Sequence, residues 1–241
     1  MKNLISIIIP VYNKSEELRA SLVSLLQQTY QNYEVIIVND GSTDNSALVI
    51  EEMKQKFWDK SIRCKIIQQS NQGSNYARNR GLEEVTQGGQ GYLLFWDADT
   101  VASPVMLAKM VKTLQDNPEV SYVYSSFILG KKKFKLWSFD AEKLKQMPYI
   151  DTTSLIRREH FPKNGWDVRI KKLQDWDLWL TMLKQNHQGI FIDEFLFTKL
   201  AGSNTMSAWF PKILYKIPLF KKKEVQSFKK AEEIIKKKHN L

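Results

Sequence analysis

The order of segments along the chain is the feature that most restricts its fold. In the first 129 of 241 residues, short apolar runs rich in Ile, Val and Leu alternate with polar loops and with segments whose apolar residues repeat at helical spacing. This alternation is typical of a parallel sheet whose strands are joined by helical crossovers. The predicted strands are residues 4–9, 34–38, 64–68, 92–96 and 120–129. We therefore expect an α/β protein.

The pattern changes beyond Gly130. The segments predicted there are a basic turn, a strand, a helix and a last strand, at 131–135, 152–156, 173–183 and 190–197. Neither an internal repeat nor a low-complexity linker divides the chain. The economical interpretation is one domain over residues 1–206, followed by an accessory tail over 207–241.

Composition and charge exclude several classes of site and partner. A single Cys and three His leave no disulfide framework and no Cys/His zinc cluster. No stretch approaches the roughly 18 apolar residues of a membrane span, and the N-terminus lacks a secretory pattern, so we expect a cytoplasmic protein. The net charge is +10, but residues 199–241 hold 11 Lys against 3 Glu and so carry most of it. A nucleic-acid-binding domain would need its own basic face, so no nucleic-acid partner is predicted.

The tail combines aromatic residues with lysines. Between residues 208 and 220 the two kinds are mixed, and three lysines follow. Such a segment suits the surface of an anionic membrane, but it could equally pack on the domain itself or on a partner. Pro211 and Pro218 prevent one continuous amphipathic helix, so both interpretations stay open.

Three polar loops each follow a predicted parallel strand, at residues 10–13, 40–44 and 97–99. The carboxyl ends of parallel strands meet at one edge of a sheet, so these loops are expected to form a ligand-binding cleft. Asp97 and Asp99 point the same way in an extended chain. A pair of carboxylates suits Mg²⁺ or Mn²⁺ with a phosphate attached.

Two further elements carry candidate functional residues. The helix entry at Gly73, within the turn and cap of residues 71–74, offers backbone N–H groups and Arg78, which together can hold a diphosphate. Asp175 lies near the start of an aromatic-rich helix and is a candidate general base whose pKa is tuned by partial burial. The alternative is that Asp175 and Asp177 only favour the positive end of that helix.

The tryptophans near Asp175 have two interpretations. Trp166, Trp176 and Trp179 could form a platform on which a sugar stacks, or they could belong to the core. We predict core positions, because large aromatic side chains are mostly buried. Ser15 is likewise predicted to have a structural role, as the cap of the first helix.

Several segments, taken in order, resemble the motifs of the family-two inverting glycosyltransferases with the GT-A fold. They read SIIIPVYN, VIIVNDGSTD, NQG with ARNRG, DAD, GWD and DWDLWL. The resemblance covers about residues 1–207. It implies a Rossmann-like, mostly parallel central sheet flanked by helices, with a nucleotide-sugar-binding half over 1–129 and a small acceptor-side half over 130–206.

The resemblance also implies roles for residues on the donor side. Pro10, Val11, Tyr12 and Asp40 would hold the nucleobase and ribose of a nucleotide-sugar donor, for which a UDP-sugar is the first expectation. Arg78 would lie near the base or the phosphates.

The carboxylates would divide the chemistry among them. Asp97 would bind the ribose side, and Asp99 would bind the divalent metal, Mn²⁺ or Mg²⁺, that bridges the diphosphate. Asp175 would deprotonate a hydroxyl of a glycan or lipid-linked acceptor as it attacks the anomeric carbon from the opposite face. Such an enzyme would serve polysaccharide biosynthesis for the cell envelope, working at the cytoplasmic face of the inner membrane.

The sequence departs from the family pattern at two places. Gln174 stands where relatives usually have Glu before the base, and residues 199–203 lack the His that many relatives use as a metal ligand. Two alternatives therefore stay open. One is a sugar nucleotidyltransferase, although residues 10–13 lack the expected glycine-rich basic loop. The other is a non-catalytic module that binds nucleotide sugars or a membrane surface.

Overall fold

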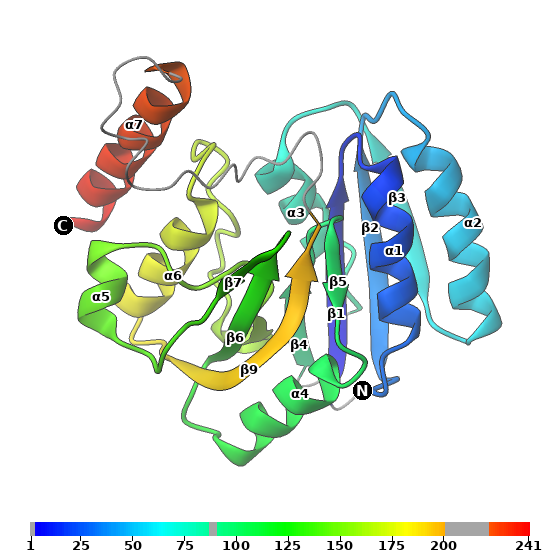
Figure 1. The fold of residues 1–241 in the computed structure, drawn as a ribbon, viewed down its shortest axis with the longest axis horizontal. Helices are drawn as coiled ribbons and strands as arrows, with labels where there is room; N and C mark the ends of the chain where they lie inside the picture. Colours follow the sequence, from blue (N-terminus) through cyan, green and yellow to red (C-terminus); the bar gives the residue numbers. More distant parts are fainter. Residues whose placement is uncertain (1–2, 87–90, 201–221) are drawn as a thin grey trace.

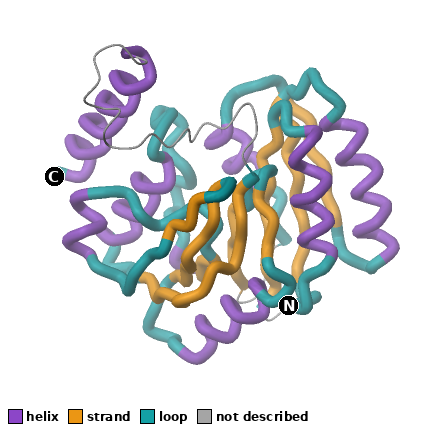
Figure 2. The backbone as a smooth tube through the Cα atoms, in the orientation of Figure 1, coloured by secondary structure: helices purple, strands orange, loops and turns teal. Residues whose placement is uncertain are grey.

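The structure is a computed structural model that describes residues 3–86, 91–200 and 222–241. Its strands are β1 (Leu4–Val11), β2 (Tyr33–Asp40), β3 (Cys64–Gln69), β4 (Gly91–Phe95), β5 (Thr100–Ala102), β6 (Tyr122–Leu129), β7 (Lys132–Phe134), β8 (Leu155–Arg157) and β9 (Gly189–Lys199). Its helices are α1 (Ser15–Leu26), α2 (Ser46–Asp59), α3 (Ser74–Leu82), α4 (Met106–Asp116), α5 (Ala141–Gln146), α6 (Gln174–Lys184) and α7 (Lys222–His239), with a 3-10 turn at Arg158–His160. Within these residues the strands form one sheet in the order β3-β2-β1-β4-β8-β6-β9-β5, with β7 paired to β6. Figures 1 and 2 show this sheet as one layer with helices around it.

The first half of the sheet is parallel, as the sequence predicts. β1 pairs in parallel with β2 and β4, and β2 pairs in parallel with β3. Successive side chains of β1 face opposite sides: Ile7 belongs to the core under α1, α2 and α4, whereas Ile8 belongs to the core under α3 and α6. Burial on both faces explains why these strands are continuous apolar runs. Because the four strands run the same way, the loops after them lie at one edge.

The second half of the sheet contains both parallel and antiparallel pairs, and it brings the C-terminal end of β9 to the edge where the loops after β1, β2 and β4 lie. β8 runs antiparallel to β4 and β6, and β6 runs parallel to β9. The short strand β5, directly after Asp99, pairs antiparallel with the end of β9, so that Thr100 lies opposite Lys199. This pairing places residues nearly a hundred positions apart next to each other.

The structure differs from the prediction for residues 131–135. Most of that segment is not a turn but the strand β7, which folds back on β6 after a turn at Gly130 with φ 57°. The hairpin is stabilised by Phe127 and Phe134, whose rings stack with centroids 4.9 Å apart. The strand β5 and the helix α5 were not predicted either.

Two predicted strand boundaries also move. β1 was expected to stop at Pro10, but it continues to Val11. Its pairing with β4 has ended before that point, so a proline without an N–H is tolerated there. The strand predicted at 152–156 begins later because Asp151 Oδ1 accepts the N–H of Thr153 at 2.8 Å and holds a turn.

The tail contains a helix that packs on the domain. α7 lies beside α6 (Figure 1), and its Ile235 is fully buried in the core under α6. The aromatic segment 208–220 and the predicted boundary between 206 and 207 lie outside the described residues. In the described part of the chain, no helix has the length and apolarity needed to cross a membrane.

Candidate active site

The loops after β1 and β2 are bound to each other. Asn13, at φ 50°, accepts the N–H of Thr43 through Oδ1 at 2.8 Å. Asp44 accepts the N–H of Ser15 at 3.0 Å. Ser15 is therefore not the cap predicted for α1: it is the first residue of the helix, and a carboxylate from the neighbouring loop satisfies its N–H. Tyr12 stands beside this joined unit with half of its surface exposed.

Pro10 and Val11 offer little side-chain surface to a ligand. Both lie in β1 opposite Val38 and Asn39 of β2, and Val11 is fully buried. Of the three residues predicted to bind a nucleobase and ribose in this segment, Tyr12 is the one whose side chain is largely exposed. An aromatic ring in that position is suited to stacking on a planar base.

Asp40 organises the turn that leads into α3. It is buried at the end of β2, where Oδ1 accepts the N–H of Gln72 at 2.9 Å and Oδ2 accepts the N–H of Gly73 at 2.8 Å. Gly73 has φ 98°, a conformation that favours glycine, and it immediately precedes α3. The predicted contact of Asp40 with the ribose stays a prediction.

Arg78 is a buried connector between the donor-side and acceptor-side loops. Its guanidinium donates to Asp97 Oδ1 at 3.0 Å and to Gln174 Oε1 at 3.2 Å. The same group lies 4.6 Å from the centroid of the Trp166 ring. Gln174, the residue that departs from the family pattern, therefore joins Arg78 as a neutral acceptor.

Asp97 binds two cationic groups of the protein. Besides Arg78, it contacts Lys199, whose Nζ lies 2.8 Å from Asp97 Oδ2 and 2.7 Å from Asp151 Oδ2. Burial alone would raise the pKa of Asp97, but Lys199 and Arg78 hold it well below its usual range. Burial alone would also lower the pKa of Lys199, whereas Asp151 and Asp97 keep it above its usual value. Asp97 and Lys199 are therefore both charged at physiological pH.

Asp99 is less well compensated than Asp97. It pairs with Lys14, whose Nζ lies 3.6 Å from Oδ2, and among the described residues its buried Oδ1 has no hydrogen-bond partner. Burial, followed by repulsion from Asp97, raises the pKa of Asp99 to about 6. A buried carboxylate oxygen without a partner fits a ligand for a cation.

A metal at Asp99 would depend on the donor for most of its ligands. The described residues contain no group of three or more His, Cys, Asp or Glu side chains arranged to hold a metal ion. Mg²⁺ sites in nucleotide-binding proteins commonly use one or two carboxylates, with substrate phosphates and waters supplying the rest. The orphaned oxygen of Asp99 fits that type of site.

Asp175 lies at the start of α6, which indole hydrogen bonds hold in place. Trp176 Nε1 donates to the carbonyl of Leu144 at 2.6 Å, and Trp179 Nε1 donates to that of Ile150 at 2.9 Å. Burial, followed by the charge of Asp151, raises the pKa of Asp175 to about 6. Such a carboxylate is ionised at neutral pH but basic enough to accept a proton.

The tryptophans near Asp175 are core residues, as predicted. Trp166, Trp176 and Trp179 are each at most 3% exposed. They therefore do not form an exposed platform for a sugar.

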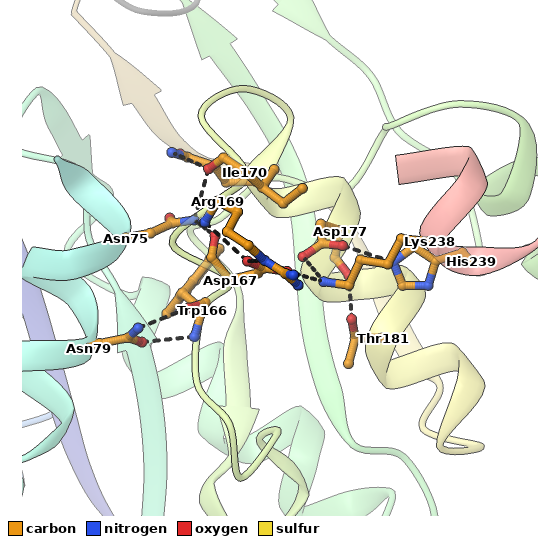
Figure 3. Close-up of polar contacts among 11 residues, drawn as sticks. Asn75, Asn79, Trp166, Asp167, Arg169, Ile170, Asp177, Thr181, Lys238 and His239 are labelled. Atoms are coloured by element: carbon orange, nitrogen blue, oxygen red, sulfur yellow. Dashed lines mark hydrogen bonds and ion pairs between the residues drawn. The ribbon is translucent and has the colours of Figure 1, made fainter. Parts of the chain in front are cut away.

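The loop that precedes α6 is tied to both neighbouring helices (Figure 3). Asn79 of α3 binds both backbone groups of Trp166, accepting its N–H at 2.8 Å and donating to its carbonyl at 2.9 Å. On the other side, Lys238 of α7 contacts Asp167 at 2.9 Å and Asp177 at 2.8 Å. Asp177 also pairs with His239. Asp177 thus anchors the tail helix and takes no part in the cluster around Asp97.

Sequence reasoning missed three residues of this site: Lys14, Asp151 and Lys199. Lys199 lies within residues 199–203, where many relatives carry a histidine, and its positive charge is the one signal of it in the sequence. Asp151 belongs to no recognised motif, and only the fold brings it to Lys199.

A sequence model of Glycosyl transferase family 2 matches residues 6–170. An uncharacterized glycosyltransferase of Haemophilus influenzae is 31% identical over 198 residues, which cover 76% of this chain and 63% of the relative. The uncharacterized glycosyltransferase YibD of Escherichia coli is 38% identical over 120 residues, covering 49% of this chain and 33% of the relative. The chain spans less than two thirds of the length of either relative.

Solved structures resemble the fold. Residues 1–349 of TarS from S. aureus, in complex with UDP-GlcNAc, superpose with a TM-score of 0.69 at 17% identity, covering 87% of this chain and 62% of that one. The mannosyltransferase PcManGT from Pyrobaculum calidifontis, in complex with GDP-Man and Mn²⁺, gives 0.65 at 17% identity, covering 84% and 58%. The similarity confirms the predicted GT-A fold, with a mostly parallel central sheet flanked by helices.

Proposed function

The chain belongs to glycosyl transferase family 2, and from this premise we propose that it is an inverting enzyme. It would move a sugar from a nucleotide-diphosphate donor to a hydroxyl group of a glycan or of a lipid-linked acceptor. The observation that carries the proposal is the position of Asp175, a carboxylate with a pKa raised to about 6 that is linked through Gln174 and Arg78 to Asp97. A base on one side and a nucleotide site on the other is the arrangement that a direct displacement needs.

Asp175 would act as the general base. It takes the proton of the acceptor hydroxyl while the oxygen attacks the anomeric carbon, and the nucleoside diphosphate leaves from the opposite face. A positioned base of this kind typically contributes about 10²–10⁴-fold to the rate. Because attack and departure occur on opposite faces, the configuration at the anomeric carbon inverts.

The donor would bind along the loops after β1, β2 and β4. Tyr12 would stack on the base, and the backbone around Pro10, Val11 and Asp40 would surround the ribose. Gly73 and the first turn of α3 would supply N–H groups toward the phosphates. TarS was solved with UDP-GlcNAc and PcManGT with GDP-Man, which supports a nucleotide sugar as donor, with a UDP-sugar as our first candidate.

Asp99 would hold a divalent metal, Mn²⁺ or Mg²⁺, together with the donor. The orphaned Oδ1 supports this assignment, as does the presence of Mn²⁺ in the PcManGT complex. When bound, the metal would neutralise charge that develops on the leaving diphosphate.

The place of action would be the cytoplasmic face of the inner membrane, where lipid-linked acceptors of envelope polysaccharides are extended. The lysine-rich tail supports this proposal, because each Lys near an anionic surface contributes about 1 kcal/mol of attraction. Co-sedimentation with vesicles of anionic lipid would test it, with neutral vesicles as the control.

A thermal-shift screen of UDP- and GDP-sugars, with and without Mn²⁺, would identify the donor, because a ligand of the native state raises the Tm. The Asp175→Asn variant is expected to bind that donor nearly as well as wild type but to lose transfer to any acceptor that wild type uses. Asp116→Asn, which changes an exposed carboxylate on α4, is the matched control.

Near wild-type transfer by Asp175→Asn would show that Asp175 is not the base. Retention of the donor's anomeric configuration in the product, measured by NMR, would exclude inversion. Donor binding without turnover against every acceptor would favour the non-catalytic alternative.

A further inference from the structure

Lys199 is a buried cation that joins the two halves of the site. Its ammonium group contacts Asp97 from the donor side and Asp151 from the acceptor side, at 2.8 and 2.7 Å. Its side chain is only 12% exposed. Both distances are those of charge-assisted hydrogen bonds, which are stronger than neutral ones.

The backbone around Lys199 is fixed by the sheet. Lys199 lies opposite Thr100 in the β5–β9 pair. Its carbonyl accepts the N–H of Gly130 at 2.9 Å, and the N–H of Leu200 donates to the carbonyl of Asp99 at 2.8 Å. The ammonium group is therefore carried on a main chain that is itself hydrogen-bonded to the Asp97–Asp99 turn.

The connection continues from Lys199 to the helix that carries Asp175. Asp151 is held by the N–H of Thr153, and the preceding carbonyl, that of Ile150, accepts the indole N–H of Trp179 on α6. Asp97 has a second partner in Arg78, which also reaches Gln174 beside Asp175. Two chains of polar contacts thus run from Asp97 to α6, one through Lys199 and one through Arg78.

We propose that Lys199 is a positioning residue of the transfer reaction, which ties Asp97 to Asp151 and so sets the distance and the electrostatic balance between the nucleotide side and Asp175. This inference rests on the proposed function, in which Asp175 is the base. Lys199 itself touches no reacting atom. It acts through the two carboxylates that it holds.

The charges around Asp175 make this role measurable. Among the described residues, the charged side chains that act most strongly on Asp175 are Asp151 before β8, Lys199 at the end of β9 and Arg78 on α3. Asp151 raises the pKa of Asp175, and Lys199 lowers it. Removing Lys199 should therefore raise the pKa of Asp175, and removing Asp151, its ion-pair partner, should lower it. A general loss of structure would not produce shifts of opposite sign.

The test compares Lys199→Met, Asp151→Asn and the double variant. Lys109→Met is the matched control, because it removes an exposed ion pair between α4 and β9. Turnover is measured as hydrolysis of the donor identified by the thermal-shift screen, so that no acceptor is needed. The pKa of Asp175 is measured in the free protein by ¹³C NMR of its carboxyl carbon, assigned with Asp175→Asn.

We expect Lys199→Met to lower kcat by about 10²-fold, the loss typical of a misplaced catalytic group, while the donor Kd changes by less than about threefold. The pKa of Asp175 should rise in Lys199→Met and fall in Asp151→Asn. The double variant, which restores the charge balance, should return that pKa toward the wild-type value. Lys109→Met should resemble wild type in all three measurements.

Three results would overturn the proposal: a kcat of Lys199→Met close to wild type, shifts of the Asp175 pKa in the same direction in both single variants, or no recovery of that pKa in the double variant. If Lys199→Met does not fold, judged by circular dichroism, Asp151→Asn and the double variant still decide the sign of the shift. Failure of the proposed function would appear elsewhere, as a wild-type protein that binds no nucleotide sugar or as full turnover by Asp175→Asn.

Discussion

Replacing Asp175 with Asn should stabilise the protein while it abolishes transfer. Asn has the shape of a protonated Asp and can still accept the N–H of Trp176, as Asp175 Oδ1 does at 2.9 Å. The change therefore removes mainly the buried negative charge. Functional sites commonly hold groups in states that reduce stability.

The magnitude follows from the pKa of the carboxyl. Burial and the neighbouring Asp151 raise the pKa of Asp175 from 3.8 to about 6. Each pKa unit corresponds to about 1.4 kcal/mol, so the charged form of Asp175 reduces the free energy of unfolding by at most about 3 kcal/mol. Solvent screening at this partly exposed side chain lowers that figure, and we expect Asp175→Asn to be more stable than wild type by about 1–3 kcal/mol. For a domain of this size, that range corresponds to a rise in Tm of roughly 3–9 °C.

The effect should depend on pH in a defined direction. The folded protein binds the Asp175 proton more tightly than the unfolded chain does, so the contribution of this group to stability is lost as pH rises from about 4 to about 6. Well below pH 3.8 both states are protonated, and wild type and Asp175→Asn should unfold alike. Well above pH 6 the stability advantage of the variant should be complete and constant.

Urea unfolding of wild type, Asp175→Asn and the control Asp116→Asn between pH 4 and pH 8 would measure this difference. Asp116 is exposed beside Lys112 on α4, and its change should be within about 0.5 kcal/mol at every pH. A variant less stable than wild type at pH 7, or a gain that does not vary with pH, would refute the reasoning.

Three further outcomes are expected. The rate of transfer should fall below about pH 6 as Asp175 takes up its proton, measured as a pH profile of kcat under saturating donor. Asp99→Ala should remove the Mn²⁺-dependent part of donor binding in calorimetry, since the orphaned oxygen would be lost; unchanged binding would exclude Asp99 as the ligand. Asp177→Ala should remove the buried carboxylate that Lys238 and His239 contact and destabilise the docking of α7 by about 1–3 kcal/mol. Hydrogen exchange in that helix should become faster; unchanged exchange would show that apolar packing alone holds it.

The parallel half of the fold was predictable because its signals are local. Each strand there is a run of apolar residues long enough to be recognised, and each is followed by a polar loop and a helix. The mixed half was predicted less well because its short elements are stabilised by partners far away in the chain. β5 has only three residues and pairs with the end of β9. No pattern in the local sequence predicts this pairing.

In the candidate site, too, the residues with local sequence signals could be predicted and those that depend on long-range contacts could not. Asp97, Asp99 and Asp175 could be selected from the sequence because they follow strands or begin a helix within recognisable motifs. Asp151 could not, since its role arises from the turn before β8. The charge of Lys199 is visible in the sequence, but its partners follow only from the β5–β9 pairing. Both carboxylate oxygens of Asp97 contact cationic side chains of the protein, and its predicted contact with a ribose stays a prediction.

Asp97 and Asp99 lie two residues apart, yet their environments shift their pKa values in opposite directions. Arg78 and Lys199 both contact Asp97 directly, whereas Lys199 acts on Asp99 only through its charge. Burial, followed by the repulsion of Asp97, raises the pKa of Asp99, and the charges of Lys199 and Lys14 offset only part of this rise. A carboxylate in that condition gains most from an added divalent cation. The pairing of Asp97 with two cations therefore supports the proposal that Asp99, rather than Asp97, is the metal ligand.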